Sequence, residues 1–177
     1  MKSGGWKRNG LRGAVVALGA VLVLGTQPAS ARVSEGSYRL VNQGTGKCLE
    51  VADWRTDNGA PVRQWDCTGG DSQRWVLVSE TGYDSGRWAL VNVHSGKCLD
   101  VPGGIMRNGV TLQQWDCWYG PGQIWDSPSR PDRSNRTLRV GDMAVEIGGY
   151  STEPGAPAQL WEFNGGWNQR WSAVAAG

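Results

Sequence analysis

The fold of this chain is decided by a 21-residue stretch that occurs twice without a gap. Residues 47–67 read KCLEVADWRTDNGAPVRQWDC, and residues 97–117 read KCLDVPGGIMRNGVTLQQWDC. A more divergent third copy, at residues 143–163, reads MAVEIGGYSTEPGAPAQLWEF. Tandem copies at a nearly constant spacing indicate one structural unit that is used three times.

Each copy is followed at the same distance by a short motif, Gln-x-Trp. The three motifs are Gln73/Trp75, Gln123/Trp125 and Gln169/Trp171. Together, the copies and the motifs delimit repeats at about residues 36–79, 86–128 and 134–174.

The residue pattern inside each repeat predicts four short strands. Polar and apolar residues alternate, Val and Trp are frequent, and glycine-rich turns such as Asn58-Gly59 separate the segments. No window combines a helical period with a helix cap. Twelve strands in three sets predict an all-β, closed or nearly closed structure with pseudo-threefold symmetry, which limits exposed sheet edges. In the first repeat the predicted strands are residues 38–42, 48–52, 61–67 and 74–78.

The first 31 residues predict an export signal rather than a part of the fold. A basic start precedes an apolar run at residues 14–24, and the segment ends in Ala29-Ser30-Ala31. The alternative is an uncleaved membrane anchor, but a span needs about 20 apolar residues and this run is shorter. We therefore expect a secreted, extracellular chain of residues 32–177, with a single domain and no membrane span after signal removal.

The charge of the chain argues against a nucleic-acid partner. Residues 1–31 carry four basic residues and no acidic ones, so their removal changes the formal net charge from +2 to −2. The remaining Lys and Arg residues are scattered, whereas nucleic-acid-binding proteins gather them into a basic patch. We expect no nucleic-acid partner.

The four cysteines occupy equivalent positions in the first two repeats. Cysteines of an exported chain usually form disulfides, although free thiols are the alternative. A metal site is disfavoured because the chain has no Cys-x-x-Cys pair and a single histidine. Of the three possible pairings, only Cys48–Cys67 with Cys98–Cys117 treats both repeats alike. Each bridge would contribute about 3 kcal/mol in the chain-entropy model.

The third repeat lacks cysteines at these two positions. It has Ala144 and Phe163 instead. We expect an apolar contact between them in place of the bridge.

Three Gln-x-Trp motifs in register with the cysteine-bearing strands resemble the ricin-B-type lectins, also called family 13 carbohydrate-binding modules. The resemblance covers essentially all of residues 38–174. It implies a β-trefoil, a six-stranded barrel capped by three hairpins. It also implies binding of galactose-type sugars, xylan or other glycans through up to three shallow pockets, one per repeat. We interpret Trp75, Trp125 and Trp171 themselves as core residues, each with a buried Gln beside it.

A sugar pocket needs two kinds of group. A hexose has a patch of C–H bonds and a ring of hydroxyls, so it needs an aromatic plate and fixed polar groups, of which a carboxylate is the strongest acceptor. In the resembled family, the carboxylate comes from the Cys-Leu-Asp-Val strand, the plate lies two residues before the second cysteine, and an Asn precedes the Gln of Gln-x-Trp. The corresponding residues are Glu50 and Trp65 in the first repeat, Asp100, Gln113 and Trp115 in the second, and Glu146, Gln159, Trp161, Asn168 and Gln169 in the third.

No repeat matches the full family pattern. The second has Gly122 in place of the Asn, and the third has Glu146 in place of Asp, which lengthens the acceptor by one methylene group. The first has Arg63 where the others have Gln, and Ser72 where the Asn is expected. We therefore expect sites in the second and third repeats rather than in the first.

Solvated strand-end acids and ordinary surface tryptophans are the alternative interpretation of these residues. Three acids and three tryptophans that recur at one spacing favour pockets instead. Trp54, Trp118 and Trp167 are further candidates, placed in loops where they would widen a glycan-binding surface.

The sequence predicts a binding module rather than an enzyme. His94 has no Ser or Cys partner placed by a motif, and the pockets account for the repeated acids. We expect a monomeric lectin that binds mono-, oligo- or polysaccharides and needs no cofactor or metal. The alternative is a β-trefoil without sugar binding, acting as an inhibitor of a protein target or as a structural cell-surface protein.

Overall fold

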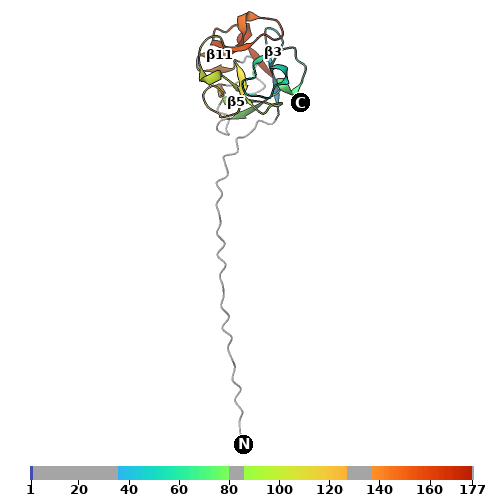
Figure 1. The fold of residues 1–177 in the computed structure, drawn as a ribbon, viewed down its shortest axis with the longest axis vertical. Helices are drawn as coiled ribbons and strands as arrows, with labels where there is room; N and C mark the ends of the chain where they lie inside the picture. Colours follow the sequence, from blue (N-terminus) through green and yellow to red (C-terminus); the bar gives the residue numbers. More distant parts are fainter. Residues whose placement is uncertain (2–35, 80–85, 127–136, 177) are drawn as a thin grey trace.

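The computed structural model describes Met1 and residues 36–79, 86–126 and 137–176, and these residues form strands joined by turns (Figure 1). Within them, helical structure is confined to single 3-10 turns. The strands of the first repeat are β1 Tyr38–Asn42, β2 Cys48–Val51, β3 Val62–Trp65 and β4 Trp75–Ser79. Those of the second are β5 Arg87–Asn92, β6 Cys98–Asp100, β7 Val110–Thr111, β8 Gln113–Trp115 and β9 Trp125–Asp126. Those of the third are β10 Arg139–Val140, β11 Met143–Ile147, β12 Ala158–Glu162 and β13 Trp171–Ala175. The 3-10 turns are η1 Ala52–Trp54, η2 Asp71–Gln73, η3 Pro102–Gly104, η4 Gly148–Tyr150 and η5 Trp167–Gln169.

The outer strands of the three repeats form a nearly closed ring. Antiparallel pairs join β13 to β1, β1 to β4, β4 to β5, β5 to β9, and β9 to β10. Between the described residues of β10 and β13, no such pairing closes the ring. The inner strands of each repeat pair as hairpins, β2 with β3, β6 with β8, and β11 with β12. This arrangement confirms the all-β trefoil prediction.

One predicted strand is divided in two. The third strand of the second repeat is interrupted at Leu112, so the described residues contain thirteen strands rather than the expected twelve. The Leu112 N–H donates to the Ala158 carbonyl at 2.9 Å, and its own carbonyl accepts from the Val62 N–H at 3.0 Å. Leu112 therefore joins its two neighbouring repeats instead of its own hairpin.

The core is built around the three Gln-x-Trp tryptophans. Trp75, Trp125 and Trp171 are 0–1% exposed, which confirms that they are core residues. Their indole N–H groups donate to the carbonyls of Leu49, Leu99 and Val145 at 3.1, 3.3 and 3.0 Å, so the polar atom of each ring is satisfied inside the protein. Leucines and β-branched residues of all three repeats complete the cluster.

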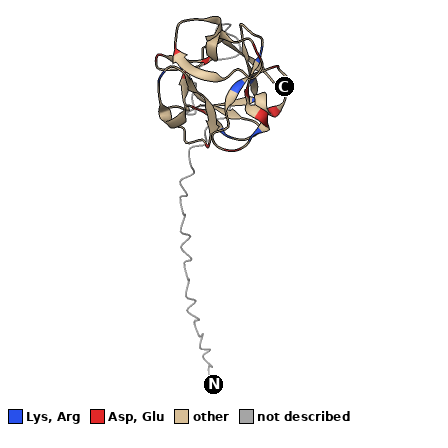
Figure 2. Cartoon of the chain, turned by 45° about the horizontal axis from the view of Figure 1, so that its top comes forward, with Lys and Arg blue, Asp and Glu red and all other residues tan. Residues whose placement is uncertain are grey.

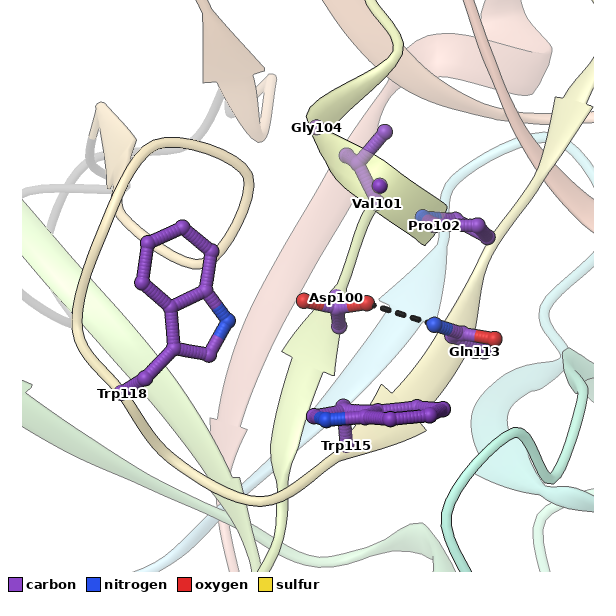
Figure 3. Close-up of a pocket in the computed structure, with 8 residues that line it drawn as sticks. Asp100, Val101, Pro102, Gly104, Gln113, Trp115 and Trp118 are labelled. Carbon is purple, nitrogen blue, oxygen red and sulfur yellow. Dashed lines mark hydrogen bonds between the residues drawn. The ribbon is translucent and has the colours of Figure 1, made fainter.

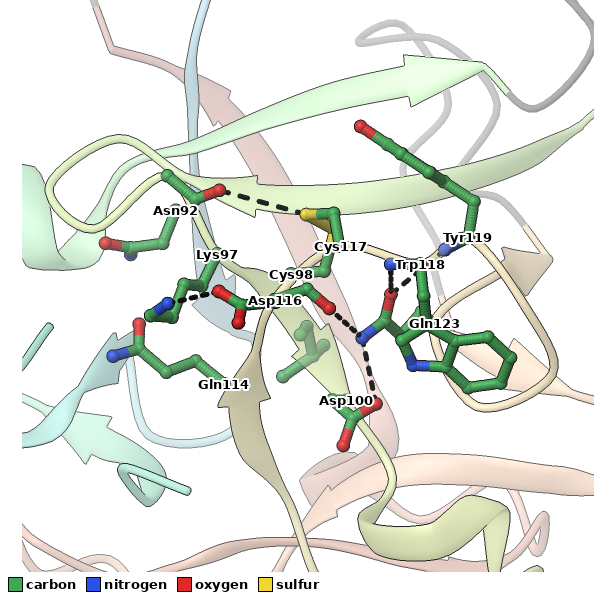
Figure 4. The surroundings of a disulfide bond; sticks show 12 residues. Asn92, Lys97, Cys98, Asp100, Gln114, Asp116, Cys117, Trp118, Tyr119 and Gln123 are labelled. Atoms are coloured by element: carbon green, nitrogen blue, oxygen red, sulfur yellow. Dashed lines mark hydrogen bonds and ion pairs between the residues drawn. A yellow bond between two sulfur atoms is a disulfide. The ribbon is translucent and has the colours of Figure 1, made fainter. Parts of the chain in front are cut away.

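The first two repeats contain the predicted disulfides, Cys48–Cys67 and Cys98–Cys117. Figure 4 shows the second bridge where it ties β6 to the segment after β8. The third repeat has Ala144 and Phe163 at the two equivalent positions, where an apolar contact is the prediction. Ala144 is fully buried, but Phe163 stays 43% exposed and packs under the Arg139 guanidinium, 4.7 Å from the ring centroid. Phe163 thus makes a cation–π contact with Arg139.

Charged residues of both signs are interspersed along the described chain (Figure 2). Several form ion pairs, including Lys47 with Asp66 and Lys97 with Asp116. None of the helical turns in the described part of the chain is long and apolar enough to cross a membrane. Apart from Met1, the segment predicted as an export signal lies outside the described residues.

Candidate functional site

Three carboxylates occupy the same place in the three repeats. Glu50, Asp100 and Glu146 lie near the ends of β2, β6 and β11, where only 6, 4 and 4% of each residue is exposed. Across each hairpin they stand opposite a hydrogen-bond donor, which is Arg63 in the first repeat, Gln113 in the second and Gln159 in the third. The strand register therefore places one acid and one hydrogen-bond donor side by side in every repeat.

Two equivalent side chains hold the carboxylate in every repeat. One oxygen accepts from the Gln of Gln-x-Trp, at 2.9 Å for Gln73, 3.0 Å for Gln123 and 3.1 Å for Gln169. The other oxygen accepts from the cross-strand residue, at 3.0 Å for Arg63 Nε, 2.7 Å for Gln113 and 2.9 Å for Gln159. Because charge-assisted hydrogen bonds are strong and directional, this pair of donors fixes the carboxylate in position.

The Gln of the motif links the core to the pocket. Figure 4 shows Gln123 donating to the Asp100 carboxylate and to the Asp116 carbonyl, while its own oxygen accepts from the Trp118 and Tyr119 N–H groups. All of its hydrogen-bonding capacity is used, as a buried amide requires. The sequence pattern identified this Gln as structural but did not reveal that its partner is the pocket acid.

Two residues that were predicted to contact sugar lie beneath the pocket instead. Asn168 and Gln169 are both 0% exposed. Asn168 donates to Glu146 Oε2 at 3.1 Å and to the Ile147 carbonyl at 3.0 Å. Both residues therefore orient Glu146 from below, and neither presents a surface to a ligand. The burial of Gln169 agrees with the interpretation of Gln-x-Trp as a core motif, whereas the burial of Asn168 is set by chain packing and was not predicted from the sequence.

The second repeat forms a pocket of about 430 Å³ (Figure 3). Asp100 lies at its centre, the Trp115 ring forms one side, and η3 with Pro102 forms the opposite side, while Trp118 stands at the edge. Trp115 is 41% and Trp118 is 54% exposed, so both rings offer apolar surface to a ligand. The lining residues are Asp100, Val101, Pro102, Gly103, Gly104, Gln113, Trp115 and Trp118.

The η3 turn belongs to this pocket, although the sequence pattern did not assign it there. Gly103 and Gly104 have φ of +61° and +65°, which glycine adopts without strain. Gly122, which replaces the family Asn, has φ of +99°, and a β-carbon there would lie 3.4 Å from the Val101 carbonyl oxygen. Glycine at position 122, in place of the family Asn, therefore suits a backbone that lies close to Val101, the residue after the pocket acid Asp100.

The aromatic plates are supported by the preceding repeat around the pseudo-threefold axis. Gly59 donates its N–H to the Gln114 carbonyl at 2.9 Å, and a β-carbon on Gly59 would lie 3.9 Å from the Trp115 ring. Gly109 stands in the same relation to Trp161, again at 3.9 Å. The tryptophans of the second and third repeats are thus each placed beside a glycine turn of another repeat.

The third repeat brings together Glu146, Gln159 and Trp161, and its tryptophan is 36% exposed. The extra methylene of Glu146 does not disrupt the arrangement, because its carboxylate keeps the two glutamine partners equivalent to those of Asp100 and also accepts from Asn168. The third repeat also has an aromatic side chain at a position where the second repeat has none. Tyr150 stands where the second repeat has Gly104, and its ring contacts Trp167 with centroids 5.4 Å apart.

The first repeat has an acid, Glu50, and a tryptophan, Trp65, at the equivalent positions, but an arginine stands in place of the cross-strand glutamine. Arg63 contacts both Glu50 and Trp65. Ser72, in the position of the family Asn, is buried. Trp54, the loop tryptophan of this repeat, is 53% exposed and makes an edge-on contact with His94.

A buried carboxylate beside an exposed indole provides a strong acceptor and an apolar face within one shallow pocket. Asp100 accepts two hydrogen bonds from protein groups, and a carboxylate has about four acceptor positions, so capacity remains for hydroxyl donors. No group of three or more His, Cys, Asp or Glu side chains among the described residues is arranged to hold a metal ion.

A threefold set of hairpins on a nearly closed β-ring, with an acid and a tryptophan in each, defines the class of ricin-B-type β-trefoils. The chain matches the family model described as "Ricin-type beta-trefoil lectin domain-like" over residues 27–115 and 80–161. The protein belongs to this family.

Solved structures show the same fold. The designed three-fold symmetric protein ThreeFoil is 34% identical, with a TM-score of 0.73, and the match covers 79% of this chain and 99% of that one. An exo-β-1,3-galactanase from Clostridium thermocellum is 32% identical, with a TM-score of 0.66, over 80% of this chain but only 30% of the galactanase. The ricin B-like lectin of Macrolepiota procera, in complex with lactose, is 21% identical, with a TM-score of 0.64, over 85% and 99% of the two chains.

Proposed function

We propose that this protein is a secreted, non-enzymatic lectin module that binds galactose-type sugars, xylan or related glycans. The second pocket (Asp100, Gln113, Trp115, with Trp118 at its edge) and the third pocket (Glu146, Gln159, Trp161) are the proposed binding sites. The observation that carries the proposal is the pairing, in both repeats, of a positioned buried carboxylate with an exposed tryptophan.

The geometry is suited to a polyhydroxylated ring. The indole face of Trp115 would cover the C–H patch of a pyranose, and Asp100 would accept hydrogen bonds from adjacent hydroxyls. The Gln113 side chain, which already donates to Asp100 at 2.7 Å, offers its carbonyl oxygen as a further acceptor. Family relationship supports the same function, since the Macrolepiota procera lectin carries lactose.

The likeness to the galactanase extends over a part of that protein, and we propose no catalytic activity for the present chain. The present chain corresponds to 30% of the galactanase.

We propose that residues 1–31 direct export and that residues 32–177 form the mature module. The two disulfides support this location because they persist in oxidising compartments.

A glycan-array screen of the mature chain would test the proposal. We expect binding to one glycan class, and each of Asp100→Ala and Glu146→Ala should weaken it. The double variant should abolish it, because each change removes the charged acceptor of one pocket. Asp142→Ala, which removes an exposed acid outside both pockets, is the matched control and should bind normally.

A folded mature chain that binds no glycan would contradict the lectin proposal and would favour a protein-directed β-trefoil. Glycan binding that survives the double variant would contradict the site assignment while leaving the lectin function standing.

A further inference from the structure

The first pocket, formed by Glu50, Arg63 and Trp65, contains one of its own side chains. Arg63 stands opposite Glu50 across the β2–β3 hairpin, in the position that Gln113 and Gln159 take in the other repeats. We propose that the Arg63 guanidinium occupies the space over Trp65 that a sugar ring would take, and that it closes this pocket to glycans. The inference rests on the proposed function, because it defines which of the three pockets are open.

Arg63 uses both features that a sugar would need. Its guanidinium carbon lies 4.3 Å from the centroid of the Trp65 ring, at stacking distance. Its Nε donates to Glu50 Oε1 at 3.0 Å, so the acceptor is engaged as well as the aromatic face. Trp65 is half-buried, whereas Trp115 and Trp161 are exposed.

A second acid fixes the arginine in place. Arg63 Nη2 donates to Asp53 Oδ1 at 3.0 Å. Asp53 lies in η1 with φ of +56°, where the second and third repeats have Gly103 and Gly149 in the same left-handed conformation. A planar guanidinium that bridges two carboxylates is held more firmly than one in a single exposed ion pair.

The charge of the cluster argues for closure rather than for a preference for acidic sugars. Glu50 and Asp53 together outweigh the single positive charge of Arg63, so an anionic sugar would meet a net negative site. A neutral sugar would have to displace an intramolecular group that is present at high effective concentration. Its apparent affinity falls in proportion to the fraction of molecules in which the arginine has moved away.

The substitution Arg63→Gln tests this directly, because Gln is the residue that the other two repeats use. The introduced glutamine would still donate to Glu50, as Gln113 does to Asp100, so the acid keeps a partner. The mature chain, labelled with ¹⁵N, would be titrated with lactose and, separately, with xylo-oligosaccharides, and the tryptophan indole N–H signals would be followed by NMR. We expect the Trp115 and Trp161 signals to shift in the unmodified protein while Trp65 stays unchanged. In the variant all three should shift, with an affinity at the first pocket raised about tenfold or more.

The reciprocal change should close an open pocket. Gln113→Arg combined with Gly103→Asp transfers the arginine and its second acid to the second repeat, and Asp tolerates the φ of +61° at position 103. The Trp115 signal should then stop responding while the Trp161 signal still shifts.

Arg55→Gln is the charge-matched control for Arg63→Gln, because it removes one positive charge from the same repeat. Arg55 pairs with Asp57, and in this control the Trp65 signal should remain unresponsive to sugar.

Two results would overturn the inference while leaving the proposed function standing. One is a Trp65 signal that responds equally in the unmodified protein and in Arg63→Gln. The other is a folded Arg63→Gln variant, with unchanged Tm, in which Trp115 and Trp161 respond but Trp65 does not. If no indole signal responds to any sugar in either protein, the proposed function fails and this inference fails with it.

Discussion

Single side chains determine which hydrogen-bond acceptor and which aromatic faces a pocket presents to a ligand. In the second pocket, the acid is buried and positioned by two amides, while the Trp115 plate is 41% exposed and meets solvent directly. Trp118 stands at the edge, its ring lying over Gly120, where a β-carbon would fall 1.6 Å from the ring. The two tryptophans therefore have different roles. Trp115 forms the wall beside the carboxylate, and Trp118 extends the surface.

We predict that Trp115→Ala weakens glycan binding at the second pocket by about tenfold or more, which corresponds to about 1.4 kcal/mol. The change removes the aromatic face against which the C–H patch of the sugar would pack. Calorimetric titration on the Glu146→Ala background, where the third pocket is inactive, would measure it. Trp118→Ala provides the comparison and should cost less. Equal losses for the two tryptophans would contradict these roles.

At the scale of elements, the hairpins are tied to neighbouring repeats by polar contacts. Asp116, next to the end of β8, pairs with Lys97, accepts from Asn58 Nδ2 at 2.8 Å, and donates its backbone N–H to Asn58 Oδ1 at 3.0 Å. The hydrogen bond from Lys97, followed by that from Asn58, holds the pKa of Asp116 below its usual value. A carboxylate with a lowered native pKa stabilises the fold above its unfolded pKa, and this contribution is lost as pH falls through the native pKa.

We predict that Asp116→Asn lowers Tm at neutral pH and that the gap from the unmodified protein narrows between about pH 5 and pH 2. The gap narrows because protonation removes from the unmodified protein the same charge that the variant lacks. Thermal melts at a series of pH values would measure it. Lys97→Met removes the ion-pair partner of Asp116. Its Tm gap from the unmodified protein should also narrow as the pH falls. A gap that stays constant across this range would show that the carboxylate charge does not contribute.

At the scale of the whole molecule, the pseudo-threefold arrangement repeats one pocket plan and then modifies each copy. The second and third repeats keep a buried acid beside an exposed tryptophan, whereas in the first repeat Arg63 lies over the tryptophan. The two proposed sites would together raise the affinity for a polymer, because the second contact is intramolecular once the first has formed.

We predict that Asp100→Ala reduces retention on a polysaccharide matrix by about a hundredfold while leaving the affinity of the third pocket for a short soluble sugar unchanged. The loss on the matrix is larger because the remaining pocket no longer benefits from a second attachment. Affinity chromatography on the polymer and calorimetry with the short sugar would separate the two effects. A matrix loss no greater than the loss of one site in solution would argue against binding through both pockets together.

The repeat pattern determined the fold, the strands of the first repeat to within two residues at each end, the disulfide pairing and the core position of Trp75, Trp125 and Trp171. These features follow from local alternation, turn residues and the equivalence of the copies, all of which can be read from the sequence. The pattern also singled out the acids and tryptophans of the proposed pockets, together with the position at which Arg63 departs from the other repeats.

Only the tertiary structure decided how these residues meet. It divided a strand at Leu112, placed Phe163 under Arg139, buried Asn168 beneath Glu146, and laid Arg63 over Trp65. Each of these outcomes depends on contacts between side chains or backbone groups in different strands or repeats. Local pattern fixes the secondary structure and the face on which a residue lies, but its partners there are set by how the hairpins pack around the axis.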